Sequence, residues 1–200
     1  MTQQELEARM ARLEDYRDIC NLQGRYNHYL MTDQHDKIPG LFAQKTSGVK
    51  IEMADSGLYE GFEGVMALFK LLGTKYHFPG GLFVHMLMTP VVEVSGDGKR
   101  AKGMWHSLGA NTYKANDGTL KAMWQHGKYD LTFVKEDGKW KYLEFRWYVT
   151  FRTPFDEGWV KKPIIGSLKH EGQPPINPLY EPYDPTQDGK FMPLPPEPGE

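Results

Sequence analysis

Four long runs of strand-forming residues, separated by Asp-Gly pairs, fill the second half of this chain and constrain its fold most. The runs cover residues 82–95, 99–114, 120–136 and 139–152. The pairs between them are Asp97-Gly98, Asp117-Gly118 and Asp137-Gly138. Because Asp-Gly between strand-like runs is a strong signal for a tight hairpin, the sequence predicts four consecutive antiparallel strands.

The first half of the chain has mainly helical periodicity. Apolar residues recur at three- and four-residue steps through residues 4–31, which predicts a long first helix. A short second helix is expected around residues 38–42 and a third over residues 62–76, while residues 49–54 alternate like a strand. Helices at one end and strands at the other predict an α+β fold. We expect a cone-shaped, strongly curved antiparallel sheet, with three helices covering its open face and a closed apolar interior.

Residues 1–153 are expected to form this domain, and residues 154–200 to form an extended proline-rich arm. Nine of the fourteen prolines fall between Pro174 and Pro198, which excludes regular helix and inner strand there. The segment nevertheless carries apolar and aromatic residues, among them Leu179, Tyr180, Phe191 and Met192. We therefore expect an arm that lies on its own domain or on a neighbouring subunit. For the last ten residues the alternative is a disordered tail.

Charge and composition exclude several classes of function. The net charge is −2 and no run of Lys or Arg exceeds two residues, which argues against a nucleic-acid surface. The single cysteine, Cys20, rules out a disulfide framework and a cysteine metal site. The polar N-terminus does not read as a signal peptide, and no apolar stretch reaches the length of a membrane span. We expect a soluble cytoplasmic protein.

Several segments together carry a resemblance to a known family. They are residues 18–26 in the first helix, 36–42 in the second, 57–64 at the strand-to-helix passage, 84–90 in a strand and 137–140 in the last hairpin. In this order and spacing the chain resembles the SnoaL-like branch of the nuclear transport factor 2-like superfamily, over about residues 10 to 152. The resemblance implies a cone-shaped barrel, commonly dimeric or trimeric, used by cofactor-free lyases, dehydratases, isomerases and cyclases and also by binding modules.

The resemblance also implies a catalytic histidine. His85 matches the histidine that acts in dehydratases and dehydrochlorinases of this group. The usual partner of that histidine is an aspartate late in the first helix, but Met31 stands at that place and Asp33 follows two residues later. A carboxylate normally orients such a histidine and stabilises its cation. The departure leaves His85 either as a weaker base or as a group in a different reaction.

Three mid-strand histidines are the candidates for acid–base chemistry. His85 is a candidate general acid or base, and the alternative is a hydrogen-bonded core histidine. His106 and His126 are candidates for polarising a substrate oxygen or holding a phenolate, although strand bulges leave their facing open. Tyr59 is either a proton relay or an aromatic plug. Three imidazoles also raise a zinc site, but the sequence has no H-E-x-x-H and no His-x-His pair.

Other residues are expected to line the pocket and bind substrate. They are Tyr26, Met31, Asp33, Trp105, His126, Arg146 and Trp147. For Arg146 a surface ion pair with Glu144 is the alternative to an inward anion clamp. Methionine and tryptophan form adaptable, polarizable walls, which favours a flat hydrophobic ligand. No glycine-rich phosphate loop is present, and we expect no cofactor and no metal.

The leading hypothesis is a cofactor-independent lyase that acts on a hydrophobic, aromatic, hydroxylated small molecule. The reaction is either dehydration or the loss of formaldehyde from a lignin-derived diarylpropane diol. The alternatives are a non-catalytic binding module and an isomerase or cyclase in the same cavity. The expected partners are the substrate and further copies of the chain, as a homodimer or homotrimer, and neither nucleic acid nor membrane.

Overall fold

A computed structural model describes the chain except for residues 116, 167–168, 177–181, 190–192 and 199–200. In chain order its elements are α1 (Gln3–Met31), the 3-10 helix η1 (His35–Leu41), β1 (Lys50–Met53), the short 3-10 turn η2 (Ala54–Ser56), β2 (Leu58–Glu60), α2 (Gly61–Tyr76), β3 (Phe83–Val94), β4 (Arg100–Lys114), β5 (Leu120–Glu136) and β6 (Lys139–Pro154). The predicted α+β class and the run of four long strands are confirmed.

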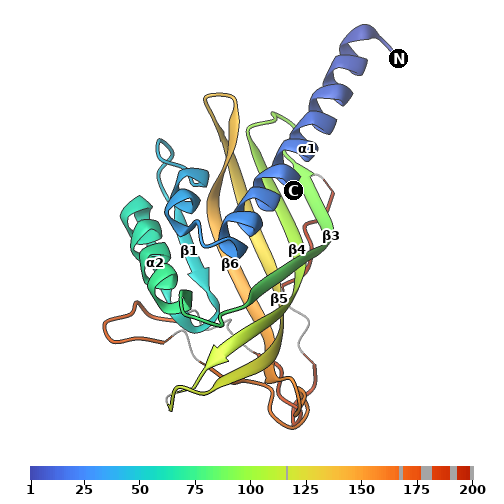
Figure 1. The fold of residues 1–200 in the computed structure, drawn as a ribbon. Helices are drawn as coiled ribbons and strands as arrows, with labels where there is room; N and C mark the ends of the chain where they lie inside the picture. The colour runs from blue at the N-terminus through green and yellow to red at the C-terminus, as the bar shows by residue number, and fades with distance from the viewer. Residues whose placement is uncertain (116, 167–168, 177–181, 190–192, 199–200) are drawn as a thin grey trace.

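The described strands form one curved sheet in the order β2-β1-β6-β5-β4-β3. Strand β1 runs parallel to β6, and every other neighbouring pair is antiparallel. The three long hairpins turn at the Asp-Gly pairs, whose glycines have positive φ as tight hairpin turns require. The long strands bend around α1, η1 and α2 (Figure 1), so the sheet and helices enclose the core between them.

A cluster of aromatic side chains fills the space between the helices and the sheet. The rings of Tyr26 and Phe145 lie 4.8 Å apart, and Phe42, just after η1, and Phe69 of α2 pack beside them. The Tyr142 hydroxyl donates a 2.7 Å hydrogen bond to Gln23 Oε1, so this buried phenol is satisfied. These side chains make the half of the cone near the β5–β6 turn solid, and the cavity lined by His85 lies farther along the strands.

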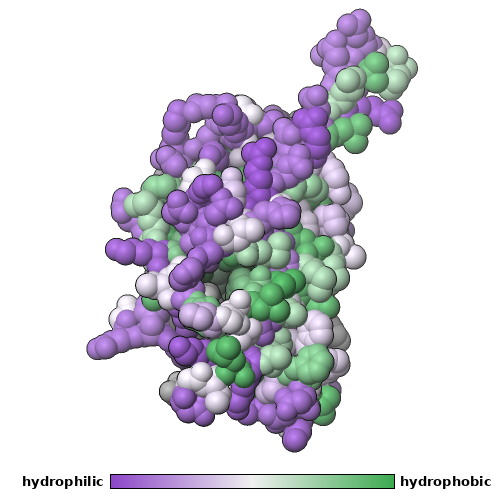
Figure 2. Space-filling view, in the orientation of Figure 1, coloured by the Kyte–Doolittle hydropathy of each residue, from purple (hydrophilic) through white to green (hydrophobic). Residues whose placement is uncertain are grey.

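Helix α1 has two halves with different surroundings. A capping box of Thr2 and Glu5 begins the helix. Its first turns project beyond the sheet, and they present Leu6, Met10 and Leu13 to solvent beside charged residues (Figures 1 and 2). The second half is buried from Asp15 onward at every third or fourth position. Only this second half contributes to the core.

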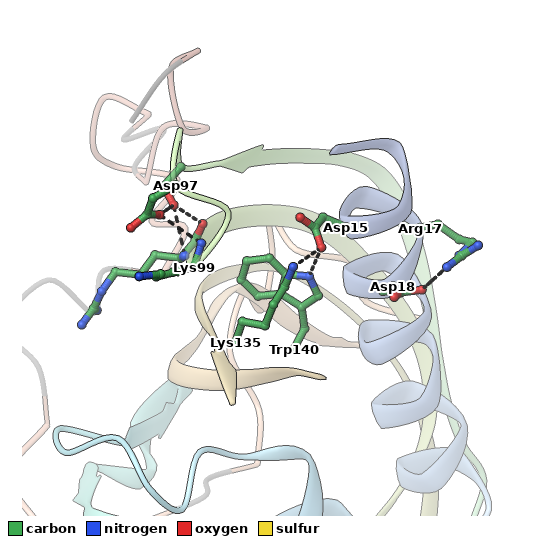
Figure 3. Close-up of polar contacts among 9 residues, drawn as sticks. Asp15, Arg17, Asp18, Asp97, Lys99, Lys135 and Trp140 are labelled. Atoms are coloured by element: carbon green, nitrogen blue, oxygen red, sulfur yellow. Dashed lines mark hydrogen bonds and ion pairs between the residues drawn. The ribbon is translucent and has the colours of Figure 1, made fainter. Parts of the chain in front are cut away.

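Asp15 fixes the point at which α1 meets the sheet (Figure 3). Its Oδ1 accepts hydrogen bonds from Lys135 Nζ at 2.5 Å and from Trp140 Nε1 at 2.8 Å. Both donors flank the β5–β6 turn, and the Lys135 ammonium also lies 4.8 Å from the centre of the Trp140 ring. One buried carboxylate therefore joins the helix to the tip of the longest hairpin.

The described part of the chain after Pro154 contains no regular helix or strand. It runs back over the domain: Ile164 forms an isolated bridge with Arg152, Pro175 O accepts from Leu58 N at 3.0 Å, and Tyr183 N donates to Thr150 O at 2.7 Å. The aromatic and apolar residues Leu179, Tyr180, Phe191 and Met192 of the predicted arm lie outside the described residues. Within the described ranges, no helix is both long and apolar enough to span a bilayer.

Candidate active site

A small cavity lies inside the cone, with His85 in its wall. Its volume is about 40 Å³, which is room for about three water molecules. The lining side chains come from α1, α2 and four strands and are mostly apolar: Tyr26, Leu30, Met53, Leu72, Phe83, His85, Met123, Gln125, Tyr129, Trp147 and Arg152. The single mid-strand histidine of β3 is thus placed at an apolar interior.

The surroundings of His85 fix its backbone and its ring. Asn27 on α1 donates a hydrogen bond of 2.7 Å to the His85 carbonyl, which ties the strand to the helix. The imidazole lies 4.6 Å from the Phe83 ring and 5.7 Å from Trp147, measured between ring centres. Opposite His85 on β4 is Gly109, where an added Cβ would lie 2.7 Å from a backbone oxygen of β3. The strand pair therefore needs glycine there.

Three neutral side chains meet the two ring nitrogens of His85. Ser107 Oγ lies 3.3 Å and the Tyr129 hydroxyl 3.4 Å from Nδ1, and the Gln125 amide nitrogen contacts Nε2. An amide nitrogen only donates, so this last contact requires an unprotonated Nε2 and leaves the ring proton on Nδ1. All contacts that the structure describes for the imidazole are thus with uncharged groups.

Burial dominates the electrostatics of this cluster. It lowers the pKa of His85 to about 3, because no charged partner offsets the loss of water around the imidazolium. Burial also raises the pKa of the Tyr129 phenol, so its hydroxyl keeps its proton. At neutral pH the site therefore holds a neutral imidazole, able to accept a proton, next to a phenol that stays protonated.

One ion pair reaches the cavity wall. Arg152, near the end of β6, lines the cavity, and its Nη2 lies 3.1 Å from Asp55 Oδ1. Both side chains are more than nine-tenths buried. The Arg152 Nε is buried as well and has no hydrogen-bond partner among the described residues. Asp55 comes from η2, so the pair ties the β1–β2 connection to the last strand.

A sequence profile of the SnoaL-like domain matches residues 11–146. The chain belongs to the SnoaL-like family. The predicted membership of the nuclear transport factor 2-like superfamily is confirmed with it. A search of curated proteins found no match to this SnoaL-like chain.

Solved structures agree with the fold. A hexachlorocyclohexane dehydrochlorinase of type 2 superposes with a TM-score of 0.62 at 17% identity, covering 73% of this chain and 92% of that one. A Novosphingobium aromaticivorans protein assigned as a scytalone dehydratase gives 0.61 at 18% identity, covering 72% and 90%. A type 3 dehydrochlorinase from Novosphingobium barchaimii gives 0.59 at 16% identity, covering 73% and 93%. At these identities the likeness establishes the fold.

The structure brings three of the predicted site residues of this SnoaL-like chain together. Tyr26 and Trp147 line the cavity with His85. Sequence reasoning missed Gln125, Tyr129 and Arg152, which line it too. The alternation of side chains along β5 could have indicated the first two. Gln125 and Tyr129 are odd-numbered like the buried Leu131, so their side chains lie on the same inner face.

His106 and His126 do not reach the cavity, which corrects the prediction that they line it. They lie half-buried on the outer face of β4 and β5, stacked with ring centres 5.4 Å apart. His126 Nδ1 is 3.0 Å from Thr150 Oγ1, and its ring stacks on Phe151, which stacks on Trp159. Even-numbered residues of β4 and β5 face outward here, whereas the inner face carries odd-numbered ones such as Ser107 and Gln125.

Tyr59 is buried but is not among the cavity-lining residues. Its hydroxyl lies 2.5 Å from His170 Nε2 in the C-terminal segment. The Tyr59 phenol therefore links strand β2 to the C-terminal segment and does not take the position of a proton relay to His85.

The end of α1 also differs from the prediction. Met31 is half-buried and does not line the cavity, and Asp33 lies beyond the helix with a positive φ of 58°. The Asp33 carboxylate contacts His35 at 3.0 Å and His77 at 2.5 Å. Asp33 therefore connects η1 to the end of α2 and does not replace the carboxylate that the family places beside its histidine.

Trp105 and Arg146 were also expected at the pocket and lie elsewhere. Trp105 is on the inner face, but it packs on Phe133 in the solid part of the core. Arg146 is on the outer face, with its Nε 3.8 Å from Glu52 Oε2. The predicted surface ion pair with Glu144 is wrong as well, because Glu144 pairs with Lys50 and the Glu52 carboxylate near Arg146 is buried.

Among the residues that the structure describes, no group of three or more His, Cys, Asp or Glu side chains is arranged to hold a metal ion. The three mid-strand histidines are split between the two faces of the sheet, with His85 inside and the other two outside.

Proposed function

We propose that this protein is a cofactor-independent lyase that acts on a hydrophobic, aromatic, hydroxylated small molecule at His85. One observation carries the proposal: a buried, uncharged imidazole in an apolar cavity, met by three neutral hydrogen-bonding side chains. We further propose a cytoplasmic homodimer or homotrimer. Exposed apolar side chains on the edge strand β3, namely Met86, Met88 and Val91, support self-association.

In a dehydration, a neutral imidazole can act first as the general base and then, once protonated, as the general acid. It accepts a proton from the substrate carbon while the carbon–oxygen bond breaks and a carbon–carbon double bond forms. The imidazolium then returns the proton to the departing hydroxide, so that water leaves. Such general acid–base catalysis contributes about 10²–10⁴ in rate, which is about 3–5 kcal/mol of barrier.

Loss of formaldehyde uses the same base with a different electron acceptor. An aromatic diol that has lost water to give a quinone methide carries its own acceptor. The imidazole takes the hydroxyl proton of the hydroxymethyl group, the carbon–carbon bond breaks and formaldehyde leaves. The electron pair of that bond forms a new carbon–carbon double bond, the quinone methide becomes a phenolate, and the imidazolium returns the proton to the phenolate oxygen. We favour this reaction over dehydration. A base that lacks a carboxylate partner and has a pKa of about 3 is weak, and an electron-poor substrate gives up its proton to a weak base more readily.

The cavity must open for either reaction. Its volume of about 40 Å³ is far below the roughly 300–1,000 Å³ of ordinary small-molecule sites. Met53 and Met123 in its wall are flexible side chains that can move aside to enlarge the cavity.

The experiment is a screen of phenolic, diaryl and alicyclic alcohols, watched by ultraviolet absorbance for new conjugation and by a colorimetric assay for formaldehyde. His85→Gln should lower kcat/KM by at least about 10². His126→Gln, which changes a histidine on the outer face, should leave the rate within about twofold because it lies outside the cavity. Equal rates for wild type and His85→Gln on any substrate that turns over would refute the role of His85.

A second candidate is a non-catalytic binding module, and the neutral contacts of His85 favour it. A site whose base has no carboxylate partner can hold a ligand through its imidazole and phenol without transferring a proton. Saturable binding of aromatic alcohols with no consumption of any of them would establish this alternative. An isomerase or cyclase would instead consume substrate without releasing water or formaldehyde.

A further inference from the structure

Two further hollows lead outward from the cavity, and each shares wall residues with the next. The middle one has a volume of about 110 Å³ and shares Met123 and Arg152 with the His85 cavity. The outer cleft has a volume of about 820 Å³ and shares Tyr113, Ile165 and Gly166 with the middle one. These shared walls place the three spaces in series, from the surface to the imidazole.

The middle hollow is lined by cations. Lys75, Lys114 and Arg152 contribute to its wall, and no Asp or Glu is among its described lining residues. We call this space the basic vestibule. The outer cleft differs, because its wall mixes Lys121 and Lys162 with Asp117, Asp156 and Glu157. Positive charge is therefore concentrated at the middle position, directly outside the apolar cavity.

Arg152 stands on the boundary between the cavity and the basic vestibule. It is only 4% exposed, and the ion pair that the structure describes for it uses one terminal nitrogen, Nη2. Its buried Nε lacks a partner among the described residues, although buried donors are nearly always hydrogen-bonded. A planar guanidinium with a spare donor is suited to a carboxylate, whose two oxygens accept a pair of parallel hydrogen bonds.

The lysines of the basic vestibule add to this preference. The Lys114 ammonium lies 6.0 Å from the centre of the Phe78 ring, in the wall of the same space. Burial lowers the pKa of Lys75, with Asp55 opposing the shift and Arg152 adding to it. Cations that have lost part of their water and stand beside another cation gain when an anion enters.

We propose that the basic vestibule binds the carboxylate of an amphipathic substrate whose apolar end reaches His85. This assignment rests on the proposed function and narrows its substrate class to aromatic carboxylic acids. The carboxylate binds Arg152 and Lys114, and the ring beyond it displaces Met123, an unbranched side chain that forms the wall between vestibule and cavity. The outer cleft is the way in for the rest of the molecule.

The test compares charged and uncharged versions of the same ligand. Cinnamate, 3-phenylpropionate and 4-phenylbutyrate are titrated into the full-length protein by calorimetry at pH 7, beside their primary amides. At least one carboxylate should bind about tenfold or more tightly than its amide, as expected for charge-assisted hydrogen bonds. Equal affinity of acid and amide in all three pairs, or no saturable binding of any acid, would overturn the proposal.

Variants then locate the contact. Lys114→Gln should weaken binding of the acid about fivefold and leave the amide unchanged, while Lys139→Gln, an exposed lysine at the start of β6, should change neither. Arg152→Gln alone removes the ion pair of a buried carboxylate, so it is combined with Asp55→Asn, and the double variant should lose about tenfold or more in affinity for the acid. Melting curves establish that each variant is folded. An acid affinity that survives in both Lys114→Gln and the double variant would refute the site.

The result separates this inference from the function on which it rests. Turnover of neutral alcohols that depends on His85, without any preference for acids, would overturn the basic vestibule and leave the lyase standing. Binding of acids that depends on Arg152, without turnover of any compound, would support the vestibule and remove the lyase.

Discussion

The burial of His85 predicts that the protein loses stability in mild acid through this one side chain. The folded-state pKa of about 3 lies below the usual value of 6.5. Between these two values the unfolded chain binds a proton that the folded chain excludes. Stability from this group is therefore fully present above pH 6.5, declines as the pH falls below 6.5, and stops declining near pH 3.

The size of the effect follows from the two pKa values. At pH 5 protonation stabilises the unfolded state at His85 by about 2 kcal/mol more than at pH 7. That is about a thirtyfold change in the folding equilibrium constant from a single residue. Burial lowers the pKa values of His35, His106 and His126 as well, so these histidines add to the total in the same direction.

A matched variant isolates the share of His85. His85→Gln keeps a polar side chain in the cavity but cannot titrate, and it leaves every other acid and base in place. Urea unfolding of both proteins is followed by tryptophan fluorescence at pH 7, 6 and 5. The wild type should lose about 2 kcal/mol more than His85→Gln between pH 7 and pH 5.

The comparison uses the change of the unfolding free energy with pH, so any pH-independent cost of His85→Gln cancels. Parallel losses for the two proteins would show that the imidazole takes up a proton in the folded state as readily as in the unfolded one. The neutral base of the proposed mechanism would then be wrong.

Two further predictions concern the packing that holds the site. Asp15→Asn removes a carboxylate that accepts hydrogen bonds from a buried indole and an ammonium, so the free energy of unfolding in urea should fall by about 1–3 kcal/mol. Asp18→Asn, which changes an exposed ion pair, is the control and should lower it by less than about 1 kcal/mol. Gly127→Ala should cost about 1–3 kcal/mol, because the new Cβ would lie 2.6 Å from Trp147 Nε1. Gly24→Ala, with nothing within 4 Å inside α1, should instead stabilise by up to about 1 kcal/mol, and an unchanged or lowered melting temperature would contradict this.

Much of the fold was predictable because its signals are local. The Asp-Gly pairs fix the turns, and the three- and four-residue steps of apolar residues fix α1 and α2. The 3-10 character of η1 was not visible, and that helix begins at His35, earlier than expected, with Pro39 inside it. The order of the strands follows from sequential hairpins, except for the parallel pairing of β1 with β6, which depends on long-range packing.

The facing of the histidines was not predictable, because one bulge decides it. Near the Asp97-Gly98 turn, β3 and β4 pair in the register Val94↔Ala101, which would place His85 and His106 on the same face if it continued. Between Met88 and Val91 the register shifts by one, and Thr89 there has a positive φ of 46°. A one-residue slip exchanges the faces of every residue beyond it. His85 is thereby turned inward while His106 stays outside.

The charge at the cavity wall decides which charged species the site can favour. In the dyad of a histidine and a carboxylate, the nearby anion stabilises the imidazolium. Here Met31 stands where the sequence comparison places that carboxylate, and Arg152 is the one formally charged side chain among the described residues that line the cavity. Burial disfavours a cation on His85, and the Arg152 guanidinium at the wall favours negative charge on the ligand. We therefore expect this interior to stabilise negative charge on substrate oxygens, as a bound carboxylate or a developing phenolate, and a phenolic aromatic acid supplies both.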